Sequence, residues 1–323
     1  MEAVLKINDL YVSYFTNFGE VKAVNGVTLN LNQGEKLGVA GESGSGKSTL
    51  ALAIMRLIRP PGRIIKGAIY INGKDVIKMN ERELRGVRWK QVAMVFQGAM
   101  NALNPTHRVA FQIMEAIRIH EKISKKEAFK KVMNLLSLVG VDPARAKDYP
   151  FQLSGGMKQR VMIAMAIALN PSVLIADEPT TALDVVTQRK ILALLKELHD
   201  RLKFSLLMIS HDIDLLLHFC DSIAVMYAGQ IVEQSSTENM VHHAMHPYTV
   251  GLLKARFHSN LKEFWSIKGS PPDLISLPPG CSFRPRCDMA SEECARENPK
   301  LIEVKPYHFV RCLKVQNVAE NGR

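Results

Sequence analysis

The feature that most constrains the fold is the octet GESGSGKS at residues 41–48, which fits the pattern G-x-x-x-x-G-K-[ST] in full. A short apolar run precedes it, and an apolar segment with helical character, residues 50–57, follows it. Glycines let the backbone curl so that successive N–H groups point inward, and the helix that starts here adds its positive end. The octet, named the phosphate loop below, is therefore predicted to bind phosphate between a buried strand and a helix.

Two side chains of the phosphate loop have specific predicted roles. Lys47 is expected to reach the β- and γ-phosphates of a nucleotide, and the Ser48 hydroxyl is expected to bind Mg²⁺. A glycine-rich turn without a ligand is a poor alternative, because both flanking segments match the motif. The other nucleotide contacts predicted here are Ser43, Gly44, Ser45, Gly46 and Thr49.

The strand pattern predicts an α/β fold. Apolar runs at 36–40, 92–96, 173–176, 205–209 and 223–227 are rich in Val, Ile, Leu and Met, and helical patterns separate several of them. That arrangement favours a mostly parallel sheet with helices on its faces. Residues 1–35 and 64–72 alternate in character instead, and they predict an antiparallel β layer.

Two further segments suggest the domain organisation. Residues 107–150 have a helical pattern that ends near Pro150, where a helix should stop, so we expect an inserted helical subdomain at about 107–160. Near residue 268 the composition changes to prolines followed by four of the five cysteines. We therefore expect a nucleotide-binding domain at 1–267 and a C-terminal extension at 268–323.

Charge and hydropathy limit where the chain works. The net charge of +11 suits nucleic acid, nucleotide, an anionic membrane or simply a lysine-rich surface, and does not choose among them. The N-terminus lacks a basic lead-in followed by an apolar run, so we expect no secretory signal. The longest apolar stretches, such as 161–169, are far shorter than the ~18 residues that span a bilayer. A role in transport therefore requires membrane-spanning partners.

A second octet, LSGGMKQR at residues 153–160, opens another helix. Ser154 is a natural N-cap, and Gly155 and Gly156 leave the helix end open to an anion, although an ordinary capped helix has the same pattern. The octet resembles the signature sequence of ABC ATPases. The resemblance covers residues 1 to about 315 and includes several motifs in the same order.

This resemblance implies a P-loop NTPase fold of the ABC ATPase type, with a RecA-like parallel core, an antiparallel β subdomain, an inserted helical subdomain and a small cysteine-containing C-terminal extension. It also implies a head-to-tail dimer that holds two ATP molecules, with an identical chain or a related ATPase as the second subunit. Ser154 and Gly156, with Gly155 between them, would then bind the γ-phosphate held by the other subunit's phosphate loop.

The pair Asp177-Glu178 closes the apolar run at 173–176, and it is predicted to provide a Mg²⁺ ligand and a general base. A carboxylate at this point can hold Mg²⁺ directly or through water, and Glu178 is placed to polarise the attacking water as general base. An acidic pair at a strand end more often lies in a solvent-exposed loop without a catalytic role. The complete phosphate loop and the following Pro179-Thr180 favour a catalytic role here.

The remaining site residues follow from the resemblance. Gln97 resembles the Q-loop glutamine, which senses Mg²⁺ and the attacking water, and His211 resembles the switch histidine, which hydrogen-bonds the γ-phosphate. Asp184 ends the segment 181–184, which resembles the D-loop at the dimer interface. Tyr14 is predicted to stack on adenine, with Phe18 as its rival.

The C-terminal extension carries Cys281, Cys287, Cys294 and Cys312, whereas Cys220 lies beside an apolar run and is predicted to be buried. Disulfides do not suit a reducing compartment. Zinc sites usually have C-x₂₋₄-C pairs, which are absent here, and a [4Fe–4S] cluster accepts looser spacing. Spacing alone leaves zinc and iron–sulfur open.

The segments HPYT at 246–249 and GSPP at 269–272, together with the cysteines, resemble the C-terminal extension of oligopeptide and dipeptide transporter ATPases. Some members with four cysteines carry a [4Fe–4S] cluster there. Residues 103–105, Leu-Asn-Pro, look like the same branch, although Gly98-Ala99 departs from the Asp-Pro often found after the Q-loop glutamine.

The resemblance implies ATP-driven import of dipeptides or oligopeptides, with oligosaccharides or nickel as alternative cargo. It implies ATP, Mg²⁺ and a [4Fe–4S] cluster as cofactors. The expected partners are two transmembrane permease subunits and, indirectly, an extracellular binding protein, with no nucleic acid. The expected location is the cytoplasmic face of a prokaryotic cell membrane, as a peripheral protein.

Three rival classes fit less well. Soluble ABC ATPases that act on DNA or ribosomes typically have coiled-coil insertions or two cassettes, and neither is present. A GTPase would read guanine with N-K-x-D, whereas residues 72–75 have the order N-x-K-D. A small-molecule kinase would leave the signature octet unexplained.

Overall fold

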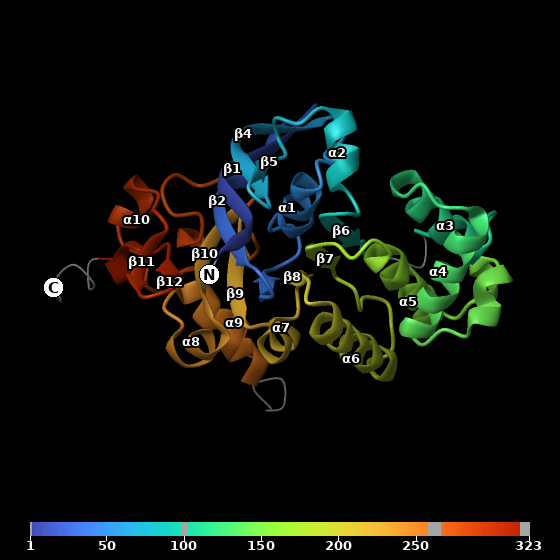
Figure 1. Ribbon diagram of the computed structural model, residues 1–323. Coiled ribbons are helices and arrows are strands. Elements are labelled where there is room, and N and C mark those ends of the chain that lie inside the picture. The colour runs from blue at the N-terminus through green and yellow to red at the C-terminus, as the bar shows by residue number, and fades with distance from the viewer. Residues whose placement is uncertain (1, 99–101, 258–265, 317–323) are drawn as a thin grey trace. The chain divides into compact units, whose positions relative to one another are not determined.

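A computed structural model describes residues 2–98, 102–257 and 266–316, except for the side chains of residues 256 and 257. The chain divides into two compact units, which are interleaved along the sequence (Figure 1). The first unit comprises residues 1–5, 31–34 and 71–207, and the second comprises residues 6–30, 35–70 and 208–323. Strand β8 (Ser205–Ser210) contributes its first half to the first unit and its second half to the second.

The second unit is built on a mixed sheet. Its strands lie in the order β11 (Ile302–Lys305), β12 (His308–Val310), β10 (Gln230–Ser236), β9 (Ser222–Tyr227), β3 (Lys36–Ala40) and the end of β8. β3 and β9 are parallel, with Val39 opposite Ala224, whereas β10 is antiparallel to both β9 and β12. β9 is buried from Ile223 onward, as expected for a strand covered on both faces.

A second sheet of this unit contains β2 (Gly19–Asn32), β1 (Ala3–Thr16) and β4 (Gly62–Ile71) in that order. A two-residue connection joins β1 to β2, so these strands are antiparallel, as the alternating pattern predicts. The helices of the second unit are α1 (Lys47–Ile54), α7 (Ile213–Phe219), α8 (Thr237–His243), α9 (Pro247–Phe257) and α10 (Glu293–Arg296). α8 and α9 pack on β10.

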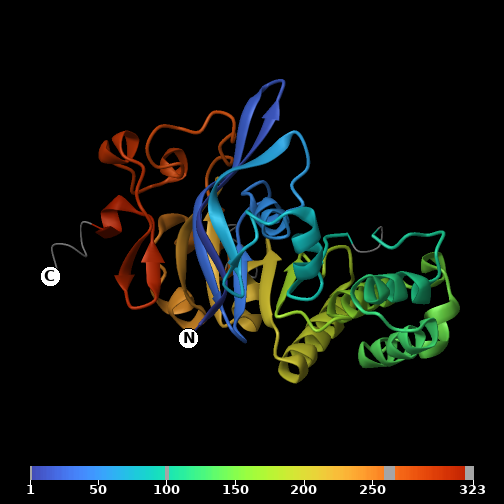
Figure 2. The same cartoon turned by 45° about the horizontal axis from the view of Figure 1, so that its top comes forward.

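The first unit contains the parallel pair β6 (Val92–Val95) and β7 (Val173–Asp177), with Val92 opposite Val173 and β8 beside β7. β5 (Lys74–Asp75), α2 (Glu81–Val87) and α6 (Val185–Leu202) also belong to it. Its remaining helices are α3 (Val109–His120), α4 (Lys125–Leu138) and α5 (Gly155–Ile167), which pack against one another as a group (Figures 1 and 2).

The sequence predicts helix as far as Pro150, and this prediction is wrong for the last part of the segment. α4 ends at Leu138, because Gly140 takes a left-handed φ of 68° and Val141 N–H donates to the Leu136 carbonyl. A glycine that terminates a helix in this way satisfies the last carbonyls. Two short 3₁₀ turns follow, and Pro150 begins the second of them.

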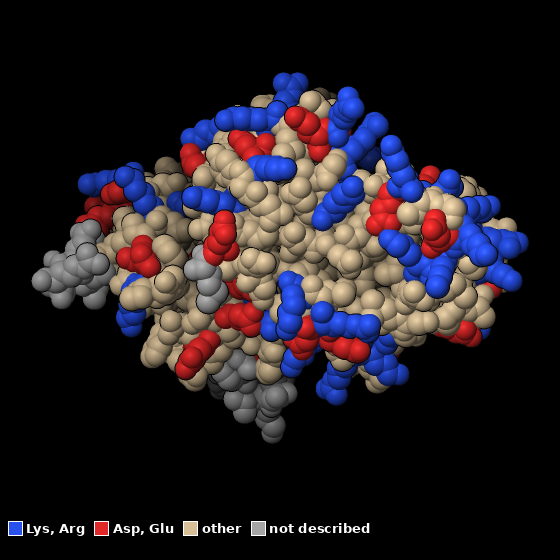
Figure 3. Space-filling model, in the orientation of Figure 1, with Lys and Arg blue, Asp and Glu red and all other residues tan. Residues whose placement is uncertain are grey.

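Much of the positive charge of the first unit lies on the α3–α4 pair. Lysine and arginine side chains gather over these helices in Figure 3, and the exposed ones include Arg118, Lys122, Lys125, Lys126, Lys130 and Lys131. Over the same described parts of the chain, no helix has the length and apolar content needed to cross a membrane.

Candidate functional site

The phosphate loop connects β3 to α1 in the second unit, in the strand–loop–helix context that its sequence predicts. Gly46 precedes the helix with a φ of 102°, and a Cβ there would lie 2.0 Å from the Ala23 carbonyl oxygen. A Cβ on Gly41 would lie 2.2 Å from the Met226 carbonyl oxygen. Only glycine fits either position, because the clashing atoms are backbone and cannot move aside.

Lys47 lies inside the curl of this loop. Its side chain is buried, and its Nζ donates to the carbonyl oxygens of Gly41 at 2.7 Å and Glu42 at 2.9 Å. The first turn of α1 begins at Lys47 itself, so the ammonium lies close to the positive end of a helix. Two sources of positive charge thus converge at this loop, which favours a polyanionic ligand.

Tyr14 and Phe18 have different surroundings in the second unit. The Tyr14 Oη lies 3.5 Å from Oγ1 of Thr49, on α1, with either atom as donor. Its ring also packs on Gly62, where a Cβ would come within 2.6 Å of Tyr14 Cε1. Phe18 lies in the turn between β1 and β2 with 89% of its surface exposed. Tyr14 is therefore the aromatic residue tied to the helix of the phosphate loop.

His211 directly follows β8, and its side chain is exposed. The next residue, Asp212, caps α7 by accepting from the backbone N–H groups of Asp214 and Leu215. The sharp strand-to-helix turn therefore presents His211 at the end of the strand, as the sequence predicts for a residue at a strand terminus.

In the first unit, two predicted catalytic residues lie in direct contact. The Gln97 Nε2 donates to the Glu178 Oε2 at 2.9 Å, although 81 positions separate them in the sequence. Thr181 Oγ1 donates to the same oxygen at 2.8 Å. The preceding residue, Asp177, ends β7 and is buried. Two donors on one oxygen fix the Glu178 carboxylate at the end of a buried strand.

Glu178 also has an unusual backbone conformation, with a φ of 45°. Non-glycine residues rarely adopt positive φ values, and such residues gather at functional sites, where the surrounding structure holds them. The contact with Thr181 was not anticipated by the sequence reasoning. The sequence feature that could have indicated this contact is the separation of three positions between Glu178 and Thr181, which a tight turn brings together.

Two predicted interface residues are helix caps in the first unit. Ser154 caps α5, and its Oγ accepts from the Met157 N–H at 3.3 Å, as predicted from the sequence. Asp184 caps α6 and accepts from both the N–H and the hydroxyl of Thr187. The side-chain bond from Thr187, and then the backbone bond, lower the pKa of Asp184 below its usual value. Gly156 lies close to Thr187, whose Cγ2 would be 2.8 Å from an added Cβ.

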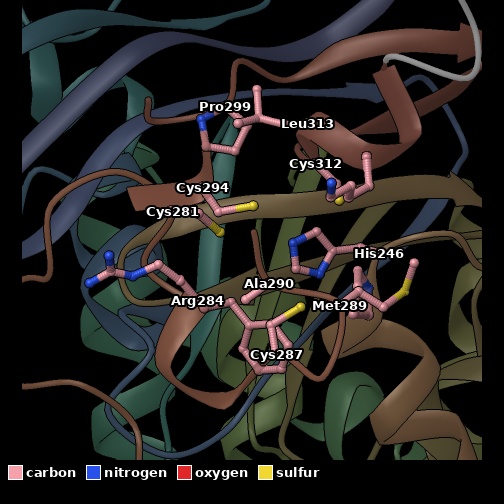
Figure 4. Close-up of a pocket in the computed structure, with 13 residues that line it drawn as sticks. His246, Cys281, Arg284, Cys287, Met289, Ala290, Cys294, Pro299, Cys312 and Leu313 are labelled. Atoms are coloured by element: carbon pink, nitrogen blue, oxygen red, sulfur yellow. The ribbon is translucent and has the colours of Figure 1, made fainter. Parts of the chain in front are cut away.

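The four C-terminal cysteines line one small cavity of the second unit together with His246 (Figure 4). The cavity has a volume of about 20 Å³, which matches a single water molecule. The Cys281 N–H donates to the Cys294 carbonyl at 2.8 Å, which holds the two ends of the cysteine loop together. The lining also includes the apolar residues Phe283 and Leu313 and the basic residues Arg284 and Lys314.

Burial raises the pKa values of the Cys281, Cys287 and Cys312 thiols, so these groups are neutral without added positive charge. Among the residues that the structure describes, no three His, Cys, Asp or Glu side chains lie close enough to hold one metal ion. Cys220 is buried away from this cavity beside Gly38, as predicted, and its thiol pKa is also raised by burial.

Family models match two parts of the chain. The ABC transporter model matches residues 24–181, and the model for the C-terminal region of oligopeptide and dipeptide transporters matches residues 232–294. The chain is 44% identical over 314 residues to the oligopeptide transport ATP-binding protein of Bacillus subtilis, covering 95% of this chain and 88% of that protein. It is also 44% identical to the dipeptide transport ATP-binding protein of the same organism, covering 100% and 98% respectively.

Among solved structures, the chain resembles a dimeric ATP-binding cassette in a post-hydrolysis state with bound ADP and phosphate. The TM-score is 0.65 at 30% identity, covering 72% of this chain and 98% of the cassette. The predicted ABC ATPase fold is therefore confirmed. The chain belongs to the oligopeptide and dipeptide transport branch of the ABC transporter ATP-binding family.

Proposed function

We propose that this chain binds and hydrolyses ATP to power the import of dipeptides or oligopeptides by an ABC transporter. The observation that carries the proposal is the complete phosphate loop, closed around Lys47 between β3 and α1, in a chain 44% identical to oligopeptide and dipeptide transport ATP-binding proteins. The family relation supports the cargo class, and the loop geometry supports the nucleotide.

In this proposal the second unit binds the nucleotide. Tyr14 stacks on adenine, because its hydroxyl contacts Thr49 while Phe18 lies exposed in its turn. Lys47 and the loop N–H groups from Ser43 to Thr49 bind the phosphates. On nucleotide binding, Lys47 exchanges its bonds with the Gly41 and Glu42 carbonyls for bonds with phosphate oxygens.

Mg²⁺ is a hard cation that takes oxygen ligands, which the Ser48 hydroxyl, the Gln97 amide and the Asp177 carboxylate offer. The position of Asp177 at the end of β7, directly before Glu178, supports this assignment. When bound, the ion neutralises charge on the β- and γ-phosphates.

Glu178 accepts a proton from the attacking water, which then displaces ADP from the γ-phosphate in line. The two hydrogen bonds to its Oε2 hold the carboxylate in one orientation directly after β7, where it can act as general base. His211 donates to the γ-phosphate. Catalysis arises mainly from positioning and charge neutralisation, as in other phosphoryl transfers.

The working enzyme in this proposal is a dimer. The solved relative is a dimer with ADP and phosphate, which supports ATP sites shared between two subunits. Ser154, Gly155 and Gly156 at the start of α5 would bind the γ-phosphate held by the second subunit. Asp184 is the N-cap of α6 and fixes the start of this helix directly after residues 181–184, the segment that resembles the D-loop.

We assign residues 1–267 to the nucleotide-binding domain, with the helical subdomain at about 107–160, and residues 268–323 to the C-terminal extension. The packing of α3, α4 and α5 into one group supports the helical subdomain. Within the peripheral complex at the membrane, two permease subunits would span the bilayer.

Copurification tests the transport assignment. The full chain, tagged and isolated in mild detergent from its own host, is expected to elute with two different or identical membrane-spanning subunits in fixed proportion. Isolation with ribosomes or DNA, and without membrane proteins, would contradict transport and support the rival class of soluble ABC ATPases.

A finer proposal concerns the four cysteines. They are the only sulfur donors of the shared cavity apart from Met289, and four thiolates suit a [4Fe–4S] cluster. No three of these side chains come within reach of one metal ion, so the cysteines would have to move to bind any metal group. The cavity must widen to admit a cluster. Iron would supply the positive charge that stabilises the thiolates, and its role would be structural.

Iron analysis tests this assignment. The chain purified without oxygen is expected to be brown, with about four irons per chain and a broad visible absorption. A variant with Cys287→Ser and Cys312→Ser is expected to lose iron, whereas Cys220→Ala, outside the cavity, is expected to keep it. A colourless, iron-free and folded wild-type sample would contradict the assignment of a [4Fe–4S] cluster.

A further inference from the structure

The phosphate loop is tied to the C-terminal extension by a bidentate ion pair. Glu42 is the second residue of the loop, and Arg286 lies 244 positions further along the chain. Arg286 Nη1 donates to Glu42 Oε2 at 2.7 Å, and Nη2 donates to Oε1 at 3.0 Å. The Arg286 side chain is only 4% exposed and that of Glu42 is 27% exposed. Parallel bonds of this kind fix both partners in one geometry, which a lysine cannot reproduce.

Arg286 also contacts two other residues of the second unit. Its Nε donates to the Lys268 carbonyl at 2.8 Å, and its guanidinium lies 5.8 Å from the centre of the Tyr227 ring, whose hydroxyl it also contacts. The hydrogen bonds that Arg286 donates to Glu42 raise the pKa of Arg286 further above its usual range. The guanidinium therefore stays charged, and its contacts with Lys268 and Tyr227 hold it in place beside Glu42.

A second contact reaches the same loop residue. The Tyr248 hydroxyl accepts from the Glu42 N–H at 3.0 Å, so both the backbone and the carboxylate of Glu42 are fixed. The rings of Tyr248 and Tyr227 contact Phe283, with centroids 5.4 and 5.2 Å apart respectively. Phe283 lines the cysteine cavity, and Arg286 directly precedes Cys287. One packed cluster thus joins the cavity to the loop.

The charge of Glu42 makes this contact consequential for a polyanionic ligand. Its backbone oxygen already accepts from Lys47 Nζ, so the residue is next to the phosphate-binding charge. A carboxylate without a counter-ion at this position would repel phosphates and compete with them for Lys47. Arg286 removes both effects, because it neutralises the carboxylate and turns it toward the C-terminal extension.

We propose that Arg286 is a positioning residue for ATP binding, which neutralises Glu42 and holds the phosphate loop in its binding shape. The proposal rests on the proposed function of that loop. The C-terminal extension would then contribute to the nucleotide site of its own chain. Tight ATP binding would require that the region around the cysteines is folded, because this region holds Arg286.

A double-mutant cycle on the full chain tests this role by ATP binding and steady-state hydrolysis. Arg286→Gln is expected to raise the KM for ATP at least tenfold with kcat within threefold, because only binding needs the neutralised loop. Glu42→Gln breaks the ion pair but leaves no unpaired carboxylate, so its KM for ATP is expected to rise less than that of Arg286→Gln. Adding Glu42→Gln to Arg286→Gln is expected to recover most of the lost affinity, since it removes the unpaired carboxylate. Arg296→Gln is the matched control, because Arg296 forms an exposed pair with Glu292 in the same extension.

Thermal melting and circular dichroism show which variants fold. Arg286→Lys keeps the charge without the parallel bonds and is the second test, with an expected rise in KM of threefold or more. An unchanged KM in both Arg286 variants, or a double variant as weak as Arg286→Gln, would overturn the positioning role. Failure of the wild-type chain to bind ATP would instead overturn the proposed function, so the two failures are distinguishable.

Discussion

Changing Glu178 to Gln is expected to lower ATP turnover at least 100-fold while ATP binding persists. Removing a general base costs roughly 10²- to 10⁴-fold in rate, and the amide cannot accept the proton of the attacking water. The substitution conserves shape, so Gln97 and Thr181 keep a hydrogen-bond acceptor at this position. The measurement is phosphate release at saturating ATP, together with the Kd of a fluorescent ATP analogue.

The same variant is expected to accumulate as a dimer when ATP is present, because the sandwiched nucleotide is no longer consumed. Size-exclusion chromatography with light scattering measures this. Glu197→Gln, an exposed carboxylate of α6 in the same unit, is the matched control and should hydrolyse ATP normally. Hydrolysis by the Glu178 variant at the wild-type rate would show that another group activates the water.

Changing Lys47 to Ala is expected to weaken ATP binding roughly 100-fold, because hydrogen bonds to charged groups contribute about 1.5–3 kcal/mol each and Lys47 is expected to make more than one. The loop itself should persist, since Gly41 and Gly46 hold its backbone against Met226 and Ala23. Isothermal titration with Mg²⁺ and ATP measures the loss.

The control for this variant is Lys66→Ala, which removes an exposed lysine of the same unit that pairs with Asp9. It is expected to bind ATP like the wild type. ATP binding of normal strength by the Lys47 variant would mean that the phosphates lie elsewhere, and would remove the basis of the proposed site.

Local pattern was sufficient for the parts of the site that lie in one continuous segment. The phosphate loop, its flanking β3 and α1, and the Ser154 cap of α5 each follow from neighbouring residues whose chemistry defines the backbone. The buried strands were also predicted from local pattern. Short runs rich in Val, Ile, Leu and Met are typical of strands that are buried on both faces of a sheet.

Contacts between distant segments were not predictable from one sequence. The bond from Gln97 to Glu178 depends on β6 and β7 being neighbours, which pattern suggests but does not specify in register. Glu42 occupies an unspecified position of the phosphate-loop motif and Arg286 lies in none of the motifs identified in the sequence, so no motif marks them as partners. The end of α4 at Leu138 depended on Gly140, a weaker signal than the proline at 150.

The most direct test of the central claim is ATP hydrolysis by the membrane complex that copurifies with this chain, with and without a peptide-loaded extracellular binding protein. Hydrolysis is expected to rise severalfold when the peptide-loaded binding protein is added, and to vanish when the chain carries Glu178→Gln. No hydrolysis by the wild-type complex, or a rate that neither peptide nor the Glu178 substitution changes, would contradict ATP-driven peptide import.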